Sequence, residues 1–185
     1  MTLDQLPPFD SESNAVHVII DTPRGSRNKY SWNEKWKLFE LTGVLPAGAV
    51  FPFDFGFIPQ TRGGDGDPLD VLVLLDEPAV AGSLVRTRLI GVIEAEQTEE
   101  GRTTRNDRLV GVAVKSRNDR DYQTLEDLSG KLVEEIEYFF VSYNKAKGKT
   151  FRPLGRFGPD RARKLVDAAR NPPQGGRGEP RLAVQ

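Results

Sequence analysis

The sequence contains no cysteine and only one histidine, His17. Disulfides and thiolate-bound metals are therefore excluded. A zinc site is disfavoured as well, because zinc prefers cysteine and histidine ligands, so any metal would have to be held by oxygen atoms. A Ser-His-Asp triad would depend entirely on His17, which falls inside an expected strand, and we predict a structural role for it rather than a catalytic one.

Long apolar segments are missing too. No run approaches the roughly 20 residues that a membrane-spanning helix requires. The N-terminal residues MTLDQLPPFD have neither the basic nor the apolar region of a secretion signal. We therefore expect a cytoplasmic protein without membrane partners. The net charge of −1 provides no basic excess, which disfavours nucleic acid as a partner.

Two common motifs for phosphate binding and nucleophilic catalysis are absent. A P-loop is excluded because Tyr143 stands where the first glycine before Gly148-Lys149-Thr150 would be required. The sequence also has no G-x-S-x-G element. Any phosphate chemistry would have to use another arrangement.

The most informative stretch is residues 63–75, GGDGDPLDVLVLL. Its glycines and proline predict a tight turn, and the apolar residues 71–75 predict a strand buried on both faces. Asp65, Asp67 and Asp70 would repel one another unless a cation lay between them. Oxygen-rich sites of this kind suit Mg²⁺. The plainer interpretation is a polar turn before a core strand; an EF-hand calcium loop does not fit, because Leu69 stands where Asp or Asn is required.

The remaining pattern predicts strands first and helices last. Expected strands cover residues 15–20, 83–95 and 109–114, a strand or hairpin covers 29–38, and residues 51–59 form an aromatic core segment. Amphipathic helices are expected near residues 130–143 and 160–170, after a capping-box sequence at 124–127. Residues 98–107 and 145–152 are expected to be loops. We interpret 1–171 as one domain and the Pro/Gly-rich residues 172–185 as a flexible tail.

An anionic ligand would need basic side chains from the loops around the aspartates. The loop candidates are Arg24, Arg27, Lys29, Arg62, Arg108, Lys145, Lys147, Lys149 and Arg152. Most of them are expected to be ordinary surface residues, since Lys and Arg normally lie there.

The run from Asp65 to Asp70, Asp-Gly-Asp-Pro-Leu-Asp, resembles the signature of the family I soluble inorganic pyrophosphatases. Further elements of the family pattern follow in the same order over roughly residues 15–149. They are Asp21-Thr22-Pro23, Lys29-Tyr30, the aromatic stretch 51–59, Asn106-Asp107-Arg108 and the segment 139–144.

This resemblance implies a mainly β fold with C-terminal helices (α+β), built on an OB-like five-stranded closed β-barrel and assembled into a homo-oligomer. It implies hydrolysis of inorganic pyrophosphate to two phosphates by water activated by Mg²⁺, with Mn²⁺ as the alternative metal. The implied roles are metal binding for Asp65, Asp70 and Asn106, proton removal from the attacking water for Asp67, and phosphate binding for Lys29, Tyr143 and Arg108.

Several positions depart from the family pattern. Asp21 replaces Glu, Ser31 replaces an acid, Phe55 replaces Tyr, Asn106 replaces Asp, Arg108 replaces Lys, Asn144 replaces Lys, and residues 40–43 supply no arginine. Each lost hydrogen bond to a charged phosphate costs about 1.5–3 kcal/mol. Two alternatives therefore stay open: a phosphate-binding protein that no longer turns over pyrophosphate, and a hydrolase of another diphosphate. Binding of single-stranded nucleic acid through a barrel surface is a weaker alternative, because the aromatic residues follow core patterns.

Overall fold

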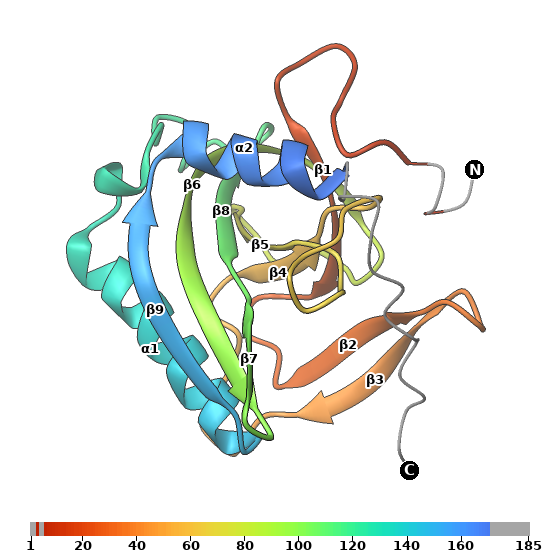
Figure 1. Ribbon diagram of the computed structural model, residues 1–185. Helices are drawn as coiled ribbons and strands as arrows, with labels where there is room; N and C mark the ends of the chain where they lie inside the picture. The colour runs from red at the N-terminus through yellow and green to blue at the C-terminus, as the bar shows by residue number, and fades with distance from the viewer. Residues whose placement is uncertain (1–2, 4–5, 171–185) are drawn as a thin grey trace.

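The computed structural model describes residue 3 and residues 6–170 (Figure 1). The strands are β1 (Val16–Thr22), β2 (Asn28–Asn33), β3 (Leu38–Val44), β4 (Asp54–Phe57), β5 (Asp70–Leu74), β6 (Leu84–Glu99), β7 (Arg102–Arg105), β8 (Arg108–Ala113) and β9 (Thr150–Phe157). The helices are α1 (Gly130–Ala146) and α2 (Pro159–Arg170), and a 3-10 turn, η2, covers Leu125–Asp127. The tail predicted at 172–185 lies outside the described residues.

Five strands form a ring, in the order β1-β4-β5-β8-β6, and β6 pairs back with β1. All neighbours are antiparallel except β5 and β8, which run parallel. The ring confirms the predicted OB-like barrel. It needs close approach of the backbones, and Gly56 on β4 provides this, since a Cβ there would lie 2.2 Å from the carbonyl oxygen of Ile19.

Strand β6 is long enough to extend beyond the ring, where it also pairs with β7 and β9. Strands β2 and β3 form a separate antiparallel hairpin, which lies below the barrel in Figure 1. The hairpin confirms the interpretation of residues 29–38 as a strand or hairpin, although β3 continues to Val44.

The core occupies both faces of β5, as the apolar run predicts. Leu72 and Leu74 belong to a cluster with Ile136 and Phe140 of α1. The alternate residue Val73 belongs to a second cluster, which includes Val166 of α2. Because successive side chains of a strand point to opposite faces, this one short strand contributes to both clusters and places Asp70 at its start.

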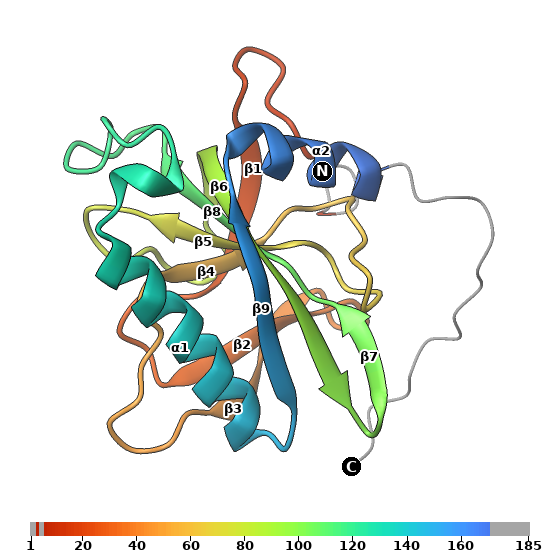
Figure 2. The ribbon, with the colours of Figure 1, turned by 60° about the vertical axis from the view of Figure 1, so that its left-hand side comes forward.

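The two helices cover the sheet from outside (Figure 2). The side chain of Ser129 caps α1 by accepting a hydrogen bond from the Leu132 amide, and α1 packs along β9. Helix α2 begins at Pro159 and packs on β6. The capping box at Thr124 and Asp127 is present, and it starts the 3-10 turn that precedes α1.

Two predicted loops are wrong. The polar segment 98–107 contains β7, and the basic segment 145–152 contains the start of β9. Pro153 is accepted within β9 because it lies at a register shift opposite Glu94 and Ala95, where the regular ladder is interrupted. No helix among residues 6–170 is long and apolar enough to cross a membrane.

Candidate active site

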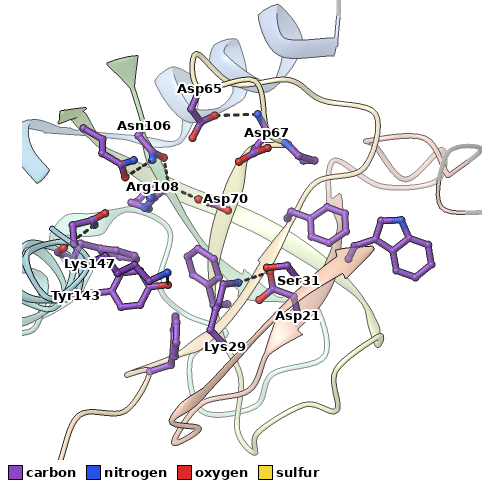
Figure 3. Close-up of a pocket in the computed structure, with 18 of the residues that line it drawn as sticks. Asp21, Lys29, Ser31, Asp65, Asp67, Asp70, Asn106, Arg108, Tyr143 and Lys147 are labelled. Atoms are coloured by element: carbon purple, nitrogen blue, oxygen red, sulfur yellow. Dashed lines mark hydrogen bonds and ion pairs between the residues drawn. The ribbon is translucent and has the colours of Figure 1, made fainter. Parts of the chain in front are cut away.

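All of the predicted site residues line one cavity of about 610 Å³ between the barrel, the β2–β3 hairpin and α1. Figure 3 shows Asp65, Asp67 and Asp70 on one side of this pocket and Lys29 across from them. Tyr143 comes from α1. The structure therefore brings together residues that are more than one hundred positions apart in sequence.

The loop before β5 holds the aspartates in a fixed turn. The Gly63 amide donates to the Asp67 carbonyl at 2.7 Å, and the Gly66 amide donates to the Gly63 carbonyl at 3.1 Å. Gly66 has φ of 94°, which favours glycine. The Asp67 amide donates to Asp65 Oδ1 at 3.2 Å. The loop is thus ordered by its own backbone and leaves the Asp67 carboxylate exposed to the cavity.

The crowded carboxylates resist ionisation. Loss of water around Asp65, together with the negative charges of Asp70 and Asp67, raises the pKa of Asp65 to about 6. Burial also raises the pKa of Asp70, although the positive charges of Arg108 and Lys29 oppose this shift. These shifts are those expected of acidic groups that lack a cation of sufficient charge.

Arg108 is the cation nearest to this cluster. Its Nη1 atom donates hydrogen bonds to Asp70 Oδ2 and to Asn106 Oδ1. The Asn106 amide nitrogen in turn donates to Gln97 Oε1 at 3.0 Å. Asn106 thus offers its oxygen to Arg108 and its nitrogen to Gln97.

Lys29 forms the opposite wall. Its Nζ atom lies 2.7 Å from Asp21 Oδ2 and 4.6 Å from the centroid of the Phe55 ring. Burial raises the pKa of Asp21 to about 6, despite the favourable charge of Lys29. The Oδ1 atom of Asp21 is buried without a hydrogen-bond partner, so this pair has spare capacity to accept a hydrogen bond or a cation.

A second basic group lies beside Tyr143. Lys147 Nζ donates to the Tyr143 hydroxyl at 2.5 Å and lies 4.4 Å from the ring centroid. Partial burial and the positive charge of Lys149 lower the pKa of Lys147. Sequence reasoning named Lys147 only as one of several loop cations. Its spacing of four residues from Tyr143, one helical turn, was the signal that distinguishes it.

The other basic residues predicted in loops differ in whether they line the cavity and in which groups they pair with. Lys149 also lines the cavity, although it pairs with Glu99 at 3.0 Å. Arg24 donates to the carbonyls of Leu75 and Asp76. Away from the cavity lining, Arg27 donates to the Leu45 carbonyl and Arg152 pairs with Glu96, while Arg62 and Lys145 do not line the cavity.

Three positions that depart from the expected family pattern, Phe55, Ser31 and Asn144, make contacts with other parts of the protein. Phe55 is buried within the aromatic core beside Phe51 and Phe140. Ser31 lines the cavity, but its hydroxyl shares a hydrogen bond with Thr42 at 3.1 Å. Asn144 is buried, and its side-chain amide donates to the Phe140 carbonyl at 2.8 Å, one turn earlier in α1. The neutral amide thus bonds to the helix backbone and brings no positive charge to the cavity.

His17 does not line the cavity. It is buried, and its Nδ1 atom lies 2.7 Å from the carbonyl oxygen of Pro7. It connects the N-terminal segment to the barrel.

Within the described part of the chain, no three acidic or histidine side chains converge closely enough to form a metal cluster by themselves. Mg²⁺ is usually held by only one or two carboxylates, with water and phosphate oxygens as its other ligands. Asp65 and Asp67, which share one turn, provide a donor set of that size and chemistry.

The family model for inorganic pyrophosphatase matches residues 18–172. The inorganic pyrophosphatase of Neisseria meningitidis serogroup B is 37% identical over 143 residues, covering 77% of this chain and 78% of that protein. The inorganic pyrophosphatase of Synechocystis is 32% identical over 160 residues, covering 86% of this chain and 92% of that protein.

Solved structures agree with these relatives. The crystal structure of inorganic pyrophosphatase from Thermus thermophilus superposes with a TM-score of 0.82 at 32% identity, covering 92% of this chain and 97% of that chain.

Proposed function

This chain belongs to the inorganic pyrophosphatase family, and we propose that it hydrolyses inorganic pyrophosphate to two phosphates. The observation that supports this most directly is the division of one cavity into an acidic wall and a basic wall. The acidic wall, Asp65, Asp67 and Asp70, suits divalent cations, and the basic wall suits phosphate oxygens.

The family implies a divalent metal, and the residues present fit one. The donor set is made of carboxylates. Burial and the negative charges of Asp70 and Asp67 raise the pKa of Asp65 even though Arg108 opposes the shift, so a further cation would be favourable beside it. We propose Mg²⁺, with Mn²⁺ as an alternative, held by Asp65 and Asp67 and by the free oxygen of Asp70. A metal ion bound there would acidify a coordinated water and neutralise charge on the phosphate.

The chain's own residues would then divide the work of phosphoryl transfer. Asp67 is exposed to the cavity and can accept the proton of the attacking water. Lys29 lies across the cavity from the aspartates and Arg108 lies beside Asp70, and both can stabilise the negative charge of the transition state. Tyr143 of α1 and Lys147, which follows the end of that helix, offer donors for the second phosphate.

Phosphate release from pyrophosphate, measured with Mg²⁺, tests this proposal. Wild type is expected to release phosphate, and Asp67→Asn is expected to release none above background. Asp121→Asn is the matched control, because that carboxylate is exposed and does not line the cavity. The proposal fails if wild type releases no more phosphate than Asp67→Asn.

A second candidate, an organic or nucleoside diphosphate as substrate, is favoured by the apolar part of the cavity lining. Leu3, Trp32 and Phe57 line the same cavity as the charged groups. Pyrophosphate has no group that would use such a lining. A panel of diphosphates assayed beside pyrophosphate separates the two, since a preference for an organic diphosphate would favour the second.

We propose that residues 1–171 act as one domain, because β5 joins the two core clusters. We also propose a homo-oligomer. Trp36, Leu38, Leu41 and Val44 leave apolar surface exposed on the hairpin, which is suited to contact with another copy. Light scattering on the purified protein tests the assembly. The cytoplasmic location stays a prediction.

A further inference from the structure

A guanidinium group lies between two of the predicted metal ligands. Arg108 Nη1 donates to Asp70 Oδ2 and to Asn106 Oδ1, and these dashed contacts converge on one nitrogen atom in Figure 3. An atom that contacts two ligand oxygens in this way stands where a bound cation would stand. The cation present is part of the protein.

Aromatic rings hold this guanidinium in place. Its central carbon lies 4.9 Å from the ring centroid of Phe140, 5.5 Å from that of Phe151 and 5.9 Å from that of Phe55. The Arg108 side chain is only 6% exposed. Contact of a guanidinium with aromatic faces is favourable, and more so when water is excluded. The guanidinium of Arg108 is therefore held by aromatic rings of β4, α1 and β9 as well as by its hydrogen bonds to Asp70 and Asn106.

The charges at this position already balance. Asp70 can contribute at most one negative charge and Asn106 contributes none, while the guanidinium of Arg108 contributes one positive charge. The hydrogen bond from the Asn106 amide nitrogen to Gln97 Oε1, at 3.0 Å, orients the amide with its oxygen toward Arg108. A divalent ion at this position would meet a positive charge at contact distance and only one carboxylate.

We propose that Arg108 replaces a metal ion between Asp70 and Asn106, so that the cavity binds one divalent ion fewer than it would with a carboxylate at position 106. This proposal deepens the metal-dependent function proposed above and rests on it. The remaining divalent ion is held on the side of Asp65 and Asp67. The Arg108 guanidinium is fixed in place and supplies part of the positive charge that neutralises a bound phosphate.

Direct titration with Mn²⁺ in the absence of pyrophosphate tests the proposal, with free Mn²⁺ followed by electron paramagnetic resonance. The double variant Asn106→Asp/Arg108→Gln restores a second carboxylate and removes the guanidinium. It is expected to bind one Mn²⁺ more than wild type, or to bind Mn²⁺ at least tenfold more tightly. Asn14→Asp is the control for the added carboxylate, because it makes the same Asn-to-Asp change beside Arg163 on the surface.

A single variant gives an independent answer if the double variant does not fold, which a thermal melt would reveal. Asn106→Ala removes the amide oxygen, and its Mn²⁺ affinity is expected to stay within twofold of wild type, because that oxygen serves Arg108. A tenfold loss of affinity in Asn106→Ala would overturn the proposal. So would titrations of wild type and the folded double variant that coincide, whether both proteins bind Mn²⁺ or neither does.

Catalytic failure is distinguishable from failure of this proposal, because the titration contains no pyrophosphate. A wild type that releases no phosphate, yet gains a Mn²⁺ ion on double substitution, would contradict the proposed hydrolysis and support the role of Arg108.

Discussion

Lys147 Nζ lies 2.5 Å from the hydroxyl of Tyr143. The Tyr143 ring is itself stacked on Phe139, with 5.7 Å between centroids. The ammonium group is therefore held by a neutral partner on a rigid ring. Its charge is therefore not paired with a carboxylate at this contact and can serve an anion in the cavity, at a site where Asn144 cannot provide a charge.

We expect Lys147→Ala to lower kcat/KM for pyrophosphate by about 10- to 100-fold, since a hydrogen bond to a charged group contributes about 1.5–3 kcal/mol. Lys145→Ala is the matched control, because Lys145 is exposed, is close in sequence and does not line the cavity. It is expected to stay within twofold of wild type. Steady-state kinetics of both variants decide the matter. Equal losses would show that only general surface charge is involved.

The acidic half of the candidate site could be predicted from sequence because it is local. Asp65, Asp67 and Asp70 lie within one turn, and the glycines and proline around them specify that turn. The basic half of the site could not be fully predicted from sequence, because its lysine and arginine side chains meet only through tertiary contacts. Lys145 and Lys147 are both expected as loop cations, and it is the extension of α1 to Ala146 that brings Lys147 beside Tyr143 in the cavity lining.

The elements of the fold also differ in how well the sequence predicts them. The apolar periodicity of β5 and α1 predicts both elements, since their burial is regular. Strand β7 has the sequence RTTR and β9 carries a proline, so neither has an apolar alternation to recognise. Both strands form because the unusually long β6 offers them a partner beyond the ring. That support comes from elsewhere in the chain and leaves no local pattern.

Glu94 joins three elements, and we expect Glu94→Gln to lower the free energy of unfolding by about 1–3 kcal/mol. Its carboxylate lies 2.7 Å from Arg105 Nη2 of β7 and 2.6 Å from Arg161 Nε of α2. Burial tends to raise the pKa of Glu94, but hydrogen bonds from the two arginines outweigh it, and the pKa is lowered.

Urea denaturation of Glu94→Gln measures this effect. The control is Glu34→Gln, which breaks an exposed pair with Lys37 and is expected to change stability by less than about 1 kcal/mol. Similar losses in the two variants would show that the buried position of Glu94 is unimportant.

Asp76 gives a pH-dependent contribution to stability. Its carboxylate accepts hydrogen bonds from the Ser116 hydroxyl at 2.6 Å and from the amides of Arg117 and Asn118. The bond from Ser116, followed by those from the two amides, lowers the pKa of Asp76 below the ordinary value of 3.8. Because the folded state binds this proton less readily than the unfolded state, the stabilisation is present above that value and is lost as the pH falls through it.

We therefore expect wild type to be more stable than Asp76→Asn at pH 7, and the difference to shrink between about pH 4.5 and pH 3. Urea denaturation across this range measures it. Asp121→Asn, which lacks these hydrogen bonds, is expected to match wild type throughout. A stability difference for Asp76→Asn that does not change with pH would contradict the assignment.

Gly56 permits closure of the strand ring, and we expect Gly56→Ala to cost at least about 1–3 kcal/mol of unfolding free energy. The added methyl group would lie 2.2 Å from the Ile19 carbonyl oxygen and 3.0 Å from Ile20 Cα. Both are backbone atoms of β1, which pairs with β4 at this point. A flexible side chain could move aside, whereas a paired strand cannot move without losing its hydrogen bonds.

Gly43→Ala separates this clash from the general effect of replacing glycine. A methyl group at Gly43 on β3 would meet no atom within 4 Å, so that variant is expected to be neutral or more stable than wild type by a few tenths of a kcal/mol. Urea denaturation compares the two. Because Phe55, which packs beneath Lys29 Nζ, immediately precedes Gly56, separation of β4 from β1 would also displace the basic wall of the cavity. Gly56→Ala should consequently lose phosphate release along with stability, while Gly43→Ala keeps both.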